Sequence, residues 1–305
     1  MDMAAPSSSP VIATPSSGVS VIMVAYHTGK ILFDSIRDVL RDGAVAELIL
    51  VDNGSTPEVE RQLQALARAD NRVTLLQGHG NIGFGRAVNL GAKSARQPWL
   101  VILNPDASLK GGTVDKLVAA AVDQPSPCIV GARVLNTDGT EQRGARRGEV
   151  TPVTTLVSLL RLERFVQGLE GFELHHHDKP LPDAPMAVPT ISGACFAISK
   201  ADFDKLGGFD PEFFLHVEDV DLCWRARKMG GIVLFHPHAE VVHEGHTSHV
   251  APTFVEWNKG KGLVYFFNKR ADTLWRKLYV WALGPLILLV SLLRSALRPR
   301  MKPEE

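Results

Sequence analysis

The first 125 residues alternate short apolar runs with amphipathic stretches, and this alternation leaves few folds open to the chain. The apolar runs are VSVIMVAY (19–26), ELILVDNGS (47–55), VTLLQG (73–78) and WLVILNPDAS (99–108). Helical spacing of apolar residues follows each of them, at 31–41, 58–69, 85–95 and 111–124. Strands that alternate with helices form a mostly parallel sheet with helices on its faces. We therefore predict an α/β, Rossmann-like fold.

Composition changes at both ends of the chain. Residues 1–17 are rich in Ser, Pro and Ala and lack the basic start and apolar stretch of a secretory signal, so we expect a disordered lead. With 305 residues, the chain is long enough for one large domain and an appendage. We expect a main domain at 18–265, with halves at 18–125 and 126–265, and a helical segment at 266–305.

Charge and cysteine content limit partners and compartment. The 33 basic and 33 acidic residues cancel, so no net field gathers nucleic acid, and we expect no nucleic-acid partner. The cysteines Cys128, Cys195 and Cys223 are odd in number and scattered. That pattern is typical of buried, reduced thiols in the cytosol rather than of a disulfide framework.

Sixteen uncharged residues, LYVWALGPLILLVSLL (278–293), lie between basic flanks near the C-terminus. As a helix they would span about 24 Å, less than the hydrocarbon core of about 30 Å. Because Pro285 lies in the middle, we expect a broken, interfacial or re-entrant segment at the membrane. Trp275, Tyr279 and Trp281 suit the headgroup level. The alternative is a core helix or a subunit contact.

Polar residues follow the apolar runs at the points where the predicted strands end. Tyr26-His27 ends the first run, Asp52-Asn53-Gly54-Ser55 the second, and Asn104-Pro105-Asp106 the fourth. In parallel sheets, ligands bind beyond the carboxyl ends of the strands. One Asp in this position is usually a turn or a helix cap, but several together indicate a binding site.

The third run leads into a glycine-rich loop, GHGNIGFGRAVN (78–89). Gly83 and Gly85 permit close backbone approach, and the following helix N-terminus favours a phosphate. Asn81 and Arg86 are candidate contacts to the same ligand. The loop is not a dinucleotide fingerprint, because Val88 stands where that motif requires glycine.

The triplet His175-His176-His177 invites a metal site. Three adjacent histidines do not all face one ion, however. We expect a solvated loop here instead.

Together, the motifs resemble the family 2 glycosyltransferases, especially rhamnosyltransferase-like members that extend bacterial surface polysaccharides. The resembling blocks run in family order from Val19 to Ser248: VIMVAYH, LILVDNGSTPE, NIGFGRAVNLG, LVILNPDASL, the 192–231 block from SGACF to KMGG, and VVHEGHTS. The resemblance implies the glycosyltransferase A (GT-A) fold, a nucleoside-diphosphate sugar donor linked to dTDP or UDP, and inversion at the anomeric carbon.

The resemblance also assigns the donor side of the site. It implies that Asp52 contacts the nucleoside and that Val24, Ala25 and Tyr26 shape the base pocket. Asn81, Gly83 and Arg86 become donor contacts. Asn104 and Asp106 match the metal motif, with Asn104 in place of its first acid, and Mg²⁺ or Mn²⁺ is the implied ion. His243 matches a second ligand, with His246 as the alternative.

On the acceptor side, the block FFLHVEDVDLCWRARKMGG (213–231) opens a helix with three acids. Asp219 matches the family's general base, and Glu218 would orient it or bind acceptor. Acids in a first helical turn are ordinarily electrostatic caps, which is the alternative. Asp221 and Arg225 are spaced as an i,i+4 pair. Gly193 matches the segment that leaves room for the acceptor sugar.

We therefore expect a transferase acting on a glycan or lipid-linked acceptor, peripherally or monotopically associated with the cytoplasmic face of the plasma membrane. A sugar-1-phosphate nucleotidyltransferase is one competitor, although no basic phosphate-gripping loop follows the first strand. A catalytically silent sugar-nucleotide-binding protein is the other. The donor sugar and base, the acceptor and the oligomeric state are not readable from the sequence.

Overall fold

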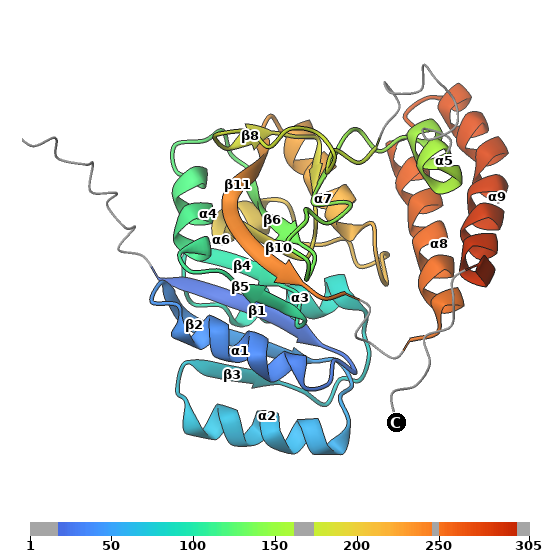
Figure 1. The fold of residues 1–305 in the computed structure, drawn as a ribbon. Coiled ribbons are helices and arrows are strands. Elements are labelled where there is room, and N and C mark those ends of the chain that lie inside the picture. Colours follow the sequence, from blue (N-terminus) through green and yellow to red (C-terminus); the bar gives the residue numbers. More distant parts are fainter. Residues whose placement is uncertain (1–17, 162–173, 246–249, 298–305) are drawn as a thin grey trace, which may run out of the picture.

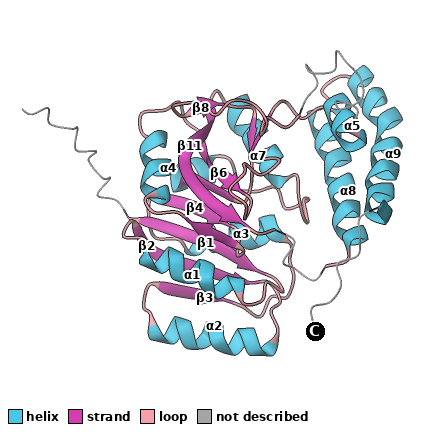
Figure 2. Ribbon diagram, viewed as in Figure 1, coloured by secondary structure: helices cyan, strands magenta, loops and turns pink. Residues whose placement is uncertain are grey.

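The computed structural model describes residues 18–161, 174–245 and 250–297. A mixed sheet with the strand order β3-β2-β1-β4-β10-β6-β11-β5 forms its centre, and β8 pairs with β11. Helices cover both faces of this sheet, and a group of helices stands beside it (Figures 1 and 2). The predicted N-terminal lead at 1–17 lies outside the described residues.

The first half confirms the predicted parallel sheet. Strands β1 (Val19–Ala25), β2 (Val45–Asp52), β3 (Val73–Leu76) and β4 (Trp99–Leu103) pair in parallel. The helices between and after them are α1 (Ile31–Arg41), α2 (Pro57–Ala69), α3 (Phe84–Ser94) and α4 (Thr113–Ala121). The apolar periodicity of the sequence places each of these elements within a few residues.

Further strands that the sequence did not resolve complete the sheet. These are β5 (Ala107–Leu109), β6 (Cys128–Leu135), β8 (Met186–Ala187), β10 (Cys195–Ser199) and β11 (Ile232–His243). Strand β10 is antiparallel to β4 and β6, β11 is parallel to β6, and β5 and β8 are antiparallel to β11. Strands β7 (Arg146–Arg147) and β9 (Thr190–Ile191) form a small second sheet. Helix α6 (Lys200–Lys205) follows β10, and α7 (Glu218–Lys228) precedes β11.

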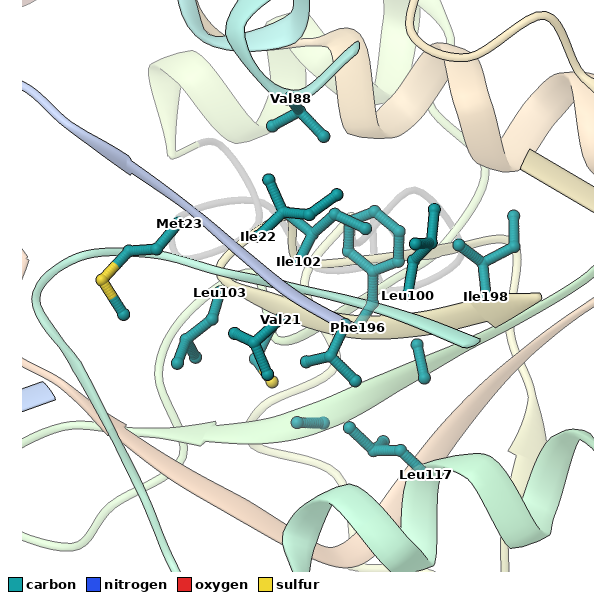
Figure 3. Packing of buried hydrophobic residues seen from close by; sticks show 14 of the residues in the cluster. Val21, Ile22, Met23, Val88, Leu100, Ile102, Leu103, Leu117, Phe196 and Ile198 are labelled. Carbon is teal, nitrogen blue, oxygen red and sulfur yellow. The ribbon is translucent and has the colours of Figure 1, made fainter. Parts of the chain in front are cut away.

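Side chains of the central strands alternate between two faces of the sheet, and both faces are buried. Ile22, Ile102 and Phe196 point toward Val88 of α3, whereas Val21 and Leu103 point toward Leu117 of α4 (Figure 3).

Helices also approach the sheet closely at glycine. A Cβ on Gly91 of α3 would lie 2.7 Å from Ile22, so only glycine lets this helix approach so near. The three cysteines are free and buried, as predicted.

The apolar run 99–108 is interrupted at Asn104-Pro105-Asp106. β4 ends at Leu103, and the Asn104 N–H donates to Ala194 O (2.8 Å) instead of continuing the parallel ladder. Since Pro105 has no N–H to donate, the chain turns and restarts as β5 on the far edge of the sheet. This turn places Asp106, buried, between two strands.

Helices α5 (Pro152–Leu160), α8 (Pro252–Arg270) and α9 (Leu274–Leu297) stand together beside the sheet (Figure 1). They share a second apolar cluster, to which Leu159, Leu263, Phe266 and Ile287 belong. Helix α7 joins the two cores, because its first turn packs into this cluster and the rest packs into the main core.

The expectation of a segment broken at Pro285 is wrong, because α9 is one helix of 24 residues. Proline removes a single backbone hydrogen bond. Val280 before it and Ile287 after it are both buried against the neighbouring helices, which hold the two halves in line. Leu274–Arg294 is long and apolar enough to cross a membrane by length and composition, a weak criterion.

Candidate active site

A cavity of about 1430 Å³ lies beyond the carboxyl ends of β1, β4 and β11 and extends to α5, α8 and α9. Eight of the predicted site residues line it: Val24, Tyr26, Asn81, Gly83, Asn104, Asp106, Asp219 and His243. The other predicted residues, Ala25, Asp52, Arg86, Gly193 and Glu218, are not among its lining residues. Residues far apart in the sequence thus share one cavity.

Asp52 ends β2 and shapes the turn that follows. Its Oδ1 accepts hydrogen bonds from the backbone N–H groups of Gly54 (3.2 Å) and Ser55 (2.9 Å), and the residue is buried. The turn-capping alternative is therefore a real role of Asp52. A contact with a nucleoside remains a prediction.

Asn53, which sequence reasoning passed over, holds the glycine-rich loop. Its Nδ2 donates to Asn81 Oδ1 (3.0 Å), and its Oδ1 accepts from the Ile82 N–H (3.2 Å). Its backbone N–H donates to Ala25 O (2.8 Å), which ties β1, β2 and the loop together. The Asp-Asn-Gly turn signal was its only mark in the sequence.

The segment before α7 packs against the start of α3. Gly83 has φ +86°, and a Cβ there would lie 2.7 Å from Phe214 O, to which the Phe84 N–H donates (3.1 Å). Arg86 is exposed, and its Nε donates to Pro211 O (2.8 Å). In this structure, Arg86 therefore anchors that segment and lies outside the cavity lining.

Asp106 and His243 meet because β5 and β11 are paired. His243 is opposite Ala107 in the antiparallel register, so the adjacent Asp106 approaches it. Asp106 Oδ1 lies 3.1 Å from His243 Nε2, and Asn104 Nδ2 donates to the same nitrogen (3.1 Å). Three side chains predicted from two distant motifs thus converge on one point.

Gln142 orients His243. The Gln142 amide nitrogen donates to Asn136 Oδ1 and His243 O (both 3.2 Å), so its Oε1 accepts the Nδ1–H of His243 (2.8 Å). This arrangement leaves the Nε2 lone pair facing Asp106. In metal-binding histidines, a hydrogen-bond acceptor for the other ring N–H commonly fixes the ring in this way. No motif in the sequence pointed to Gln142.

The donor set suits a divalent ion. A carboxylate and an imidazole are ligands for Mn²⁺, and the carboxylate also suits Mg²⁺. Among residues 18–161, 174–245 and 250–297, no three His, Cys, Asp or Glu side chains gather as a complete metal site. An ion here would need further ligands from a bound diphosphate. The alternative histidine, His246, lies outside the described residues.

Helix α7 begins from a strained turn. His216 (φ +67°) and Val217 (φ +75°) are both in the left-handed region, which a β-branched residue rarely adopts. Such backbone outliers cluster at functional sites, where the surroundings hold them. Here Gly262 of α8 packs against the turn, and a Cβ on it would lie 3.2 Å from His216 O.

Asp219 faces the cavity and is held on several sides. Its Oδ2 accepts from the Gly193 N–H (3.1 Å) and pairs with Arg147, and its Oδ1 accepts from the Val220 N–H (2.8 Å). Arg147 also donates to Ile191 O (2.6 Å). The carboxylate is therefore fixed in orientation. Arg147 was not among the site residues predicted from the sequence.

Glu218 is buried and is not among the residues that line the cavity. Burial, together with the adjacent Asp219 charge, raises the pKa of Glu218 to about 8. Its Oε2 has no hydrogen-bond partner within the described part of the chain. At neutral pH the Glu218 side chain therefore keeps its proton.

We expect Glu218→Gln to stabilise the fold increasingly as pH rises. Native Glu218 keeps its proton up to about pH 8, whereas an unfolded glutamate loses it near 4.5. Because the native state then binds more protons, the wild type loses stability between these values and glutamine does not. The variant should melt at least about 2 °C higher at pH 8, a shift that about 1 kcal/mol produces.

Thermal unfolding of both proteins from pH 5 to pH 8.5 measures this. Glu212→Gln, at an exposed position of the same segment, is the control. A melting difference that stays constant across the pH range would contradict the assignment of a buried, protonated Glu218.

The predicted pair of Asp221 and Arg225 is confirmed, at 2.7 Å. Asp221 is fully buried and also pairs with Lys269 of α8 (2.7 Å). Lys269 contacts Asp210 as well (2.6 Å). Asp221 thus fastens the helix that carries Asp219 to the helices beside the sheet.

The histidine triplet differs from the expected solvated loop. His175 Nε2 hydrogen-bonds Ser158 Oγ of α5 (3.1 Å), and all three histidines are only partly exposed. Burial, together with the charges of Arg143, Arg147 and Lys259, lowers the pKa of His175 to about 2. The expectation was wrong because α5 and α8, whose packing the sequence did not reveal, cover this segment.

Solved structures share the overall fold of this chain. The mannosyltransferase PcManGT of Pyrobaculum calidifontis, solved with GDP-Man and Mn²⁺, is 17% identical with a TM-score of 0.59, covering 94% of this chain and 77% of that one. GalNAc-T7, solved with UDP, GalNAc and Mn²⁺, is 18% identical with a TM-score of 0.59, covering 88% and 54%. The chain therefore has the glycosyltransferase A (GT-A) fold.

The chain belongs to glycosyl transferase family 2, whose model matches residues 20–207. An N-acetylglucosaminyl-diphospho-decaprenol L-rhamnosyltransferase of Mycobacterium tuberculosis is 29% identical over 306 aligned positions, which cover 91% of this chain and 94% of that protein. The low-salt glycan biosynthesis hexosyltransferase Agl10 of Haloferax volcanii is 25% identical, covering 69% and 62%. Within the family, the chain is rhamnosyltransferase-like.

Proposed function

We propose that the protein is an inverting, metal-dependent glycosyltransferase. It moves rhamnose from a dTDP- or UDP-linked donor to a hydroxyl of a lipid-linked glycan during bacterial surface polysaccharide synthesis. The observation that carries the proposal is that Asp106, His243 and Asp219 line one cavity beyond the strand ends. The name of the mycobacterial relative supports both the sugar and the lipid-linked diphosphate acceptor.

The donor occupies the half of the cavity formed by residues 18–125. Val24, Ala25 and Tyr26 at the end of β1 shape the base pocket, and Asp52 contacts the nucleoside from beneath. Asn81 and Gly83 contact the donor from the loop that Asn53 holds. Arg86 contributes by anchoring the segment over this loop.

Asp106 and His243, with Asn104 beside them, would hold Mg²⁺ or Mn²⁺. When bound, such an ion offsets the negative charge that develops on the departing nucleoside diphosphate. Gln142 keeps His243 turned toward that position.

Asp219 is the general base. It takes the proton of the acceptor hydroxyl as that oxygen attacks the anomeric carbon and the bond to the diphosphate breaks. Attack from the face opposite the leaving group inverts the anomeric centre. Arg147 and the Gly193 N–H fix the carboxylate in position, and Gly193 leaves room for the acceptor sugar. Glu218, which is buried next to Asp219, helps to orient it.

The acceptor half comprises residues 126–265, and α8 runs across position 265 into the C-terminal helical part. We place α9 on the cytoplasmic face of the plasma membrane. Trp275 and Trp281 are 80% and 79% exposed, as befits side chains at the headgroup level. A full crossing would carry α8 and its charged Lys261 into lipid alongside α9, so surface attachment fits better. Co-sedimentation with anionic vesicles checks this placement.

The test of the function is transfer itself. We expect the wild-type protein, given dTDP-rhamnose, Mn²⁺ and an N-acetylglucosaminyl-diphospho-polyprenol, to form a rhamnosylated lipid, detected by mass spectrometry. UDP-sugars replace dTDP-rhamnose in parallel reactions, and EDTA should stop turnover until metal is restored.

Three results would contradict the proposal. Pyrophosphate release from a nucleoside triphosphate and a sugar phosphate would indicate a nucleotidyltransferase. Donor binding without transfer to any acceptor would indicate a silent binding protein. Retention of the anomeric configuration, read by NMR, would overturn the inverting mechanism.

A further inference from the structure

We propose that the end of the cavity next to α5 binds the diphosphate group of a polyprenyl-linked acceptor. This inference rests on the proposed function and adds to it a second anion site, separate from that of the donor diphosphate. The basic arm, as we name this end, is formed by Arg143, His175, Lys259 and Arg294 around Ser158 and Leu159, all of which line the cavity.

Side chains from distant segments converge on the basic arm. Arg143 Nη2 donates to Ser158 Oγ (3.0 Å), and His175 Nε2 contacts the same hydroxyl (3.1 Å). Arg294 of α9 reaches Leu159 O (3.5 Å). Contributions from the loop after β6, from α5 and from α9 thus meet within one wall of the cavity.

The charge of the arm favours an anion. Arg143 and Lys259 both act on the buried His175, which stays neutral beside them. Glu256, one turn before Lys259 on α8, is a carboxylate in the same lining. Lysine and arginine together supply the charge-assisted donors that phosphate oxygens accept.

The order of chemistry along the cavity matches the order of groups in such an acceptor. Asp219 marks the position of the attacking hydroxyl, and Arg147, its ion-pair partner, is also close enough to His175 to depress its pKa. The basic arm includes His175, and α9, which contributes Arg294 to the arm, carries exposed apolar side chains along its length. A sugar, a diphosphate and an isoprenoid chain follow one another in that sequence.

The donor diphosphate does not explain the arm. Its expected position is beside Asp106 and His243, at the ends of β4 and β11. The arm takes Ser158 from α5, Lys259 from α8 and Arg294 from α9, and Arg143 and His175 from the segments before and after α5, none of which belongs to the donor half. The arm therefore adjoins the donor site through Gln142 and Arg143, but it presents charged side chains of its own to the cavity.

The test measures binding of farnesyl diphosphate by calorimetry, with the donor site filled by dTDP and Mn²⁺. We expect Lys259→Gln and Arg143→Gln each to weaken binding at least about tenfold, the loss of one charge-assisted contact. The Kd for dTDP and the melting temperature should change little. Lys261→Gln is the matched control, because Lys261 lies on the same helix but is exposed and stacks on Trp257.

Several outcomes would overturn the inference. One is unchanged binding in both arm variants. Another is an equal loss in Lys261→Gln, which would indicate general surface charge. A third is no binding of farnesyl diphosphate by the wild type at about 1 mM. If the arm variants lose binding to phosphatidylglycerol vesicles to the same extent as binding to farnesyl diphosphate, the arm binds lipid headgroups instead. Absence of sugar transfer, measured separately, would contradict the proposed function but would not change the outcome of the binding test.

Discussion

Asp219→Asn is expected to reduce sugar transfer by about 10²- to 10⁴-fold, the usual contribution of a positioned general base. The amide keeps the shape of the carboxylate and can still accept the Gly193 N–H, but it cannot take the acceptor proton. Because Asp219 lies away from the strand ends that hold the nucleotide, the Kd for the donor nucleotide should change less than threefold. Initial rates and calorimetry on the same preparation measure both quantities.

The neighbouring carboxyl supplies the decisive control for this result. Glu218→Gln should retain most of the transfer activity if Asp219 is the base, since Glu218 is buried and outside the cavity lining. The reverse outcome, with Asp219→Asn active and Glu218→Gln inactive, would assign the proton transfer to Glu218 instead.

Asp106→Asn should lower turnover by more than about 100-fold, the upper end of what even outer-shell metal partners cost. The change removes the one carboxylate that faces His243 Nε2, so the site loses its charged oxygen ligand. We also expect loss of the extra thermal stabilisation that Mn²⁺ gives in the presence of dTDP. That second readout does not depend on catalysis.

Asp115→Asn, on α4 and outside the cavity lining, is the control for Asp106→Asn. Its melting temperature should respond to Mn²⁺ and dTDP as the wild type does. Metal-dependent stabilisation that survives in Asp106→Asn would mean that the ion binds elsewhere.

The parallel half of the fold was predictable because its signals are local. Buried strands read as continuous apolar runs, and helices such as 31–41 repeat their apolar residues with a period near 3.6. The Asp221–Arg225 pair was predictable for the same reason, because one turn of helix separates the two residues.

The other features depend on contacts that no local pattern specifies. Arg147 reaches Asp219 only because the two-residue strands β7 and β9 pair across more than 40 intervening positions. Gln142 contacts His243 because β11 pairs with its neighbouring strands. Pro285 stays within a continuous helix because neighbouring helices pack against α9. The roles of the site residues remain predictions until the variants are measured.

Lys269 links α7, which carries Asp219, to α8, the helix that packs along α9. If α9 lies flat on the bilayer as we propose, this ion pair sets the height of the reactive carboxylate above the lipid surface. A hydroxyl on the first sugars of a growing glycan comes within reach, whereas one at the tip of a long polymer does not. The ion pair would then limit sugar transfer to the first sugars of the glycan, those nearest the lipid surface.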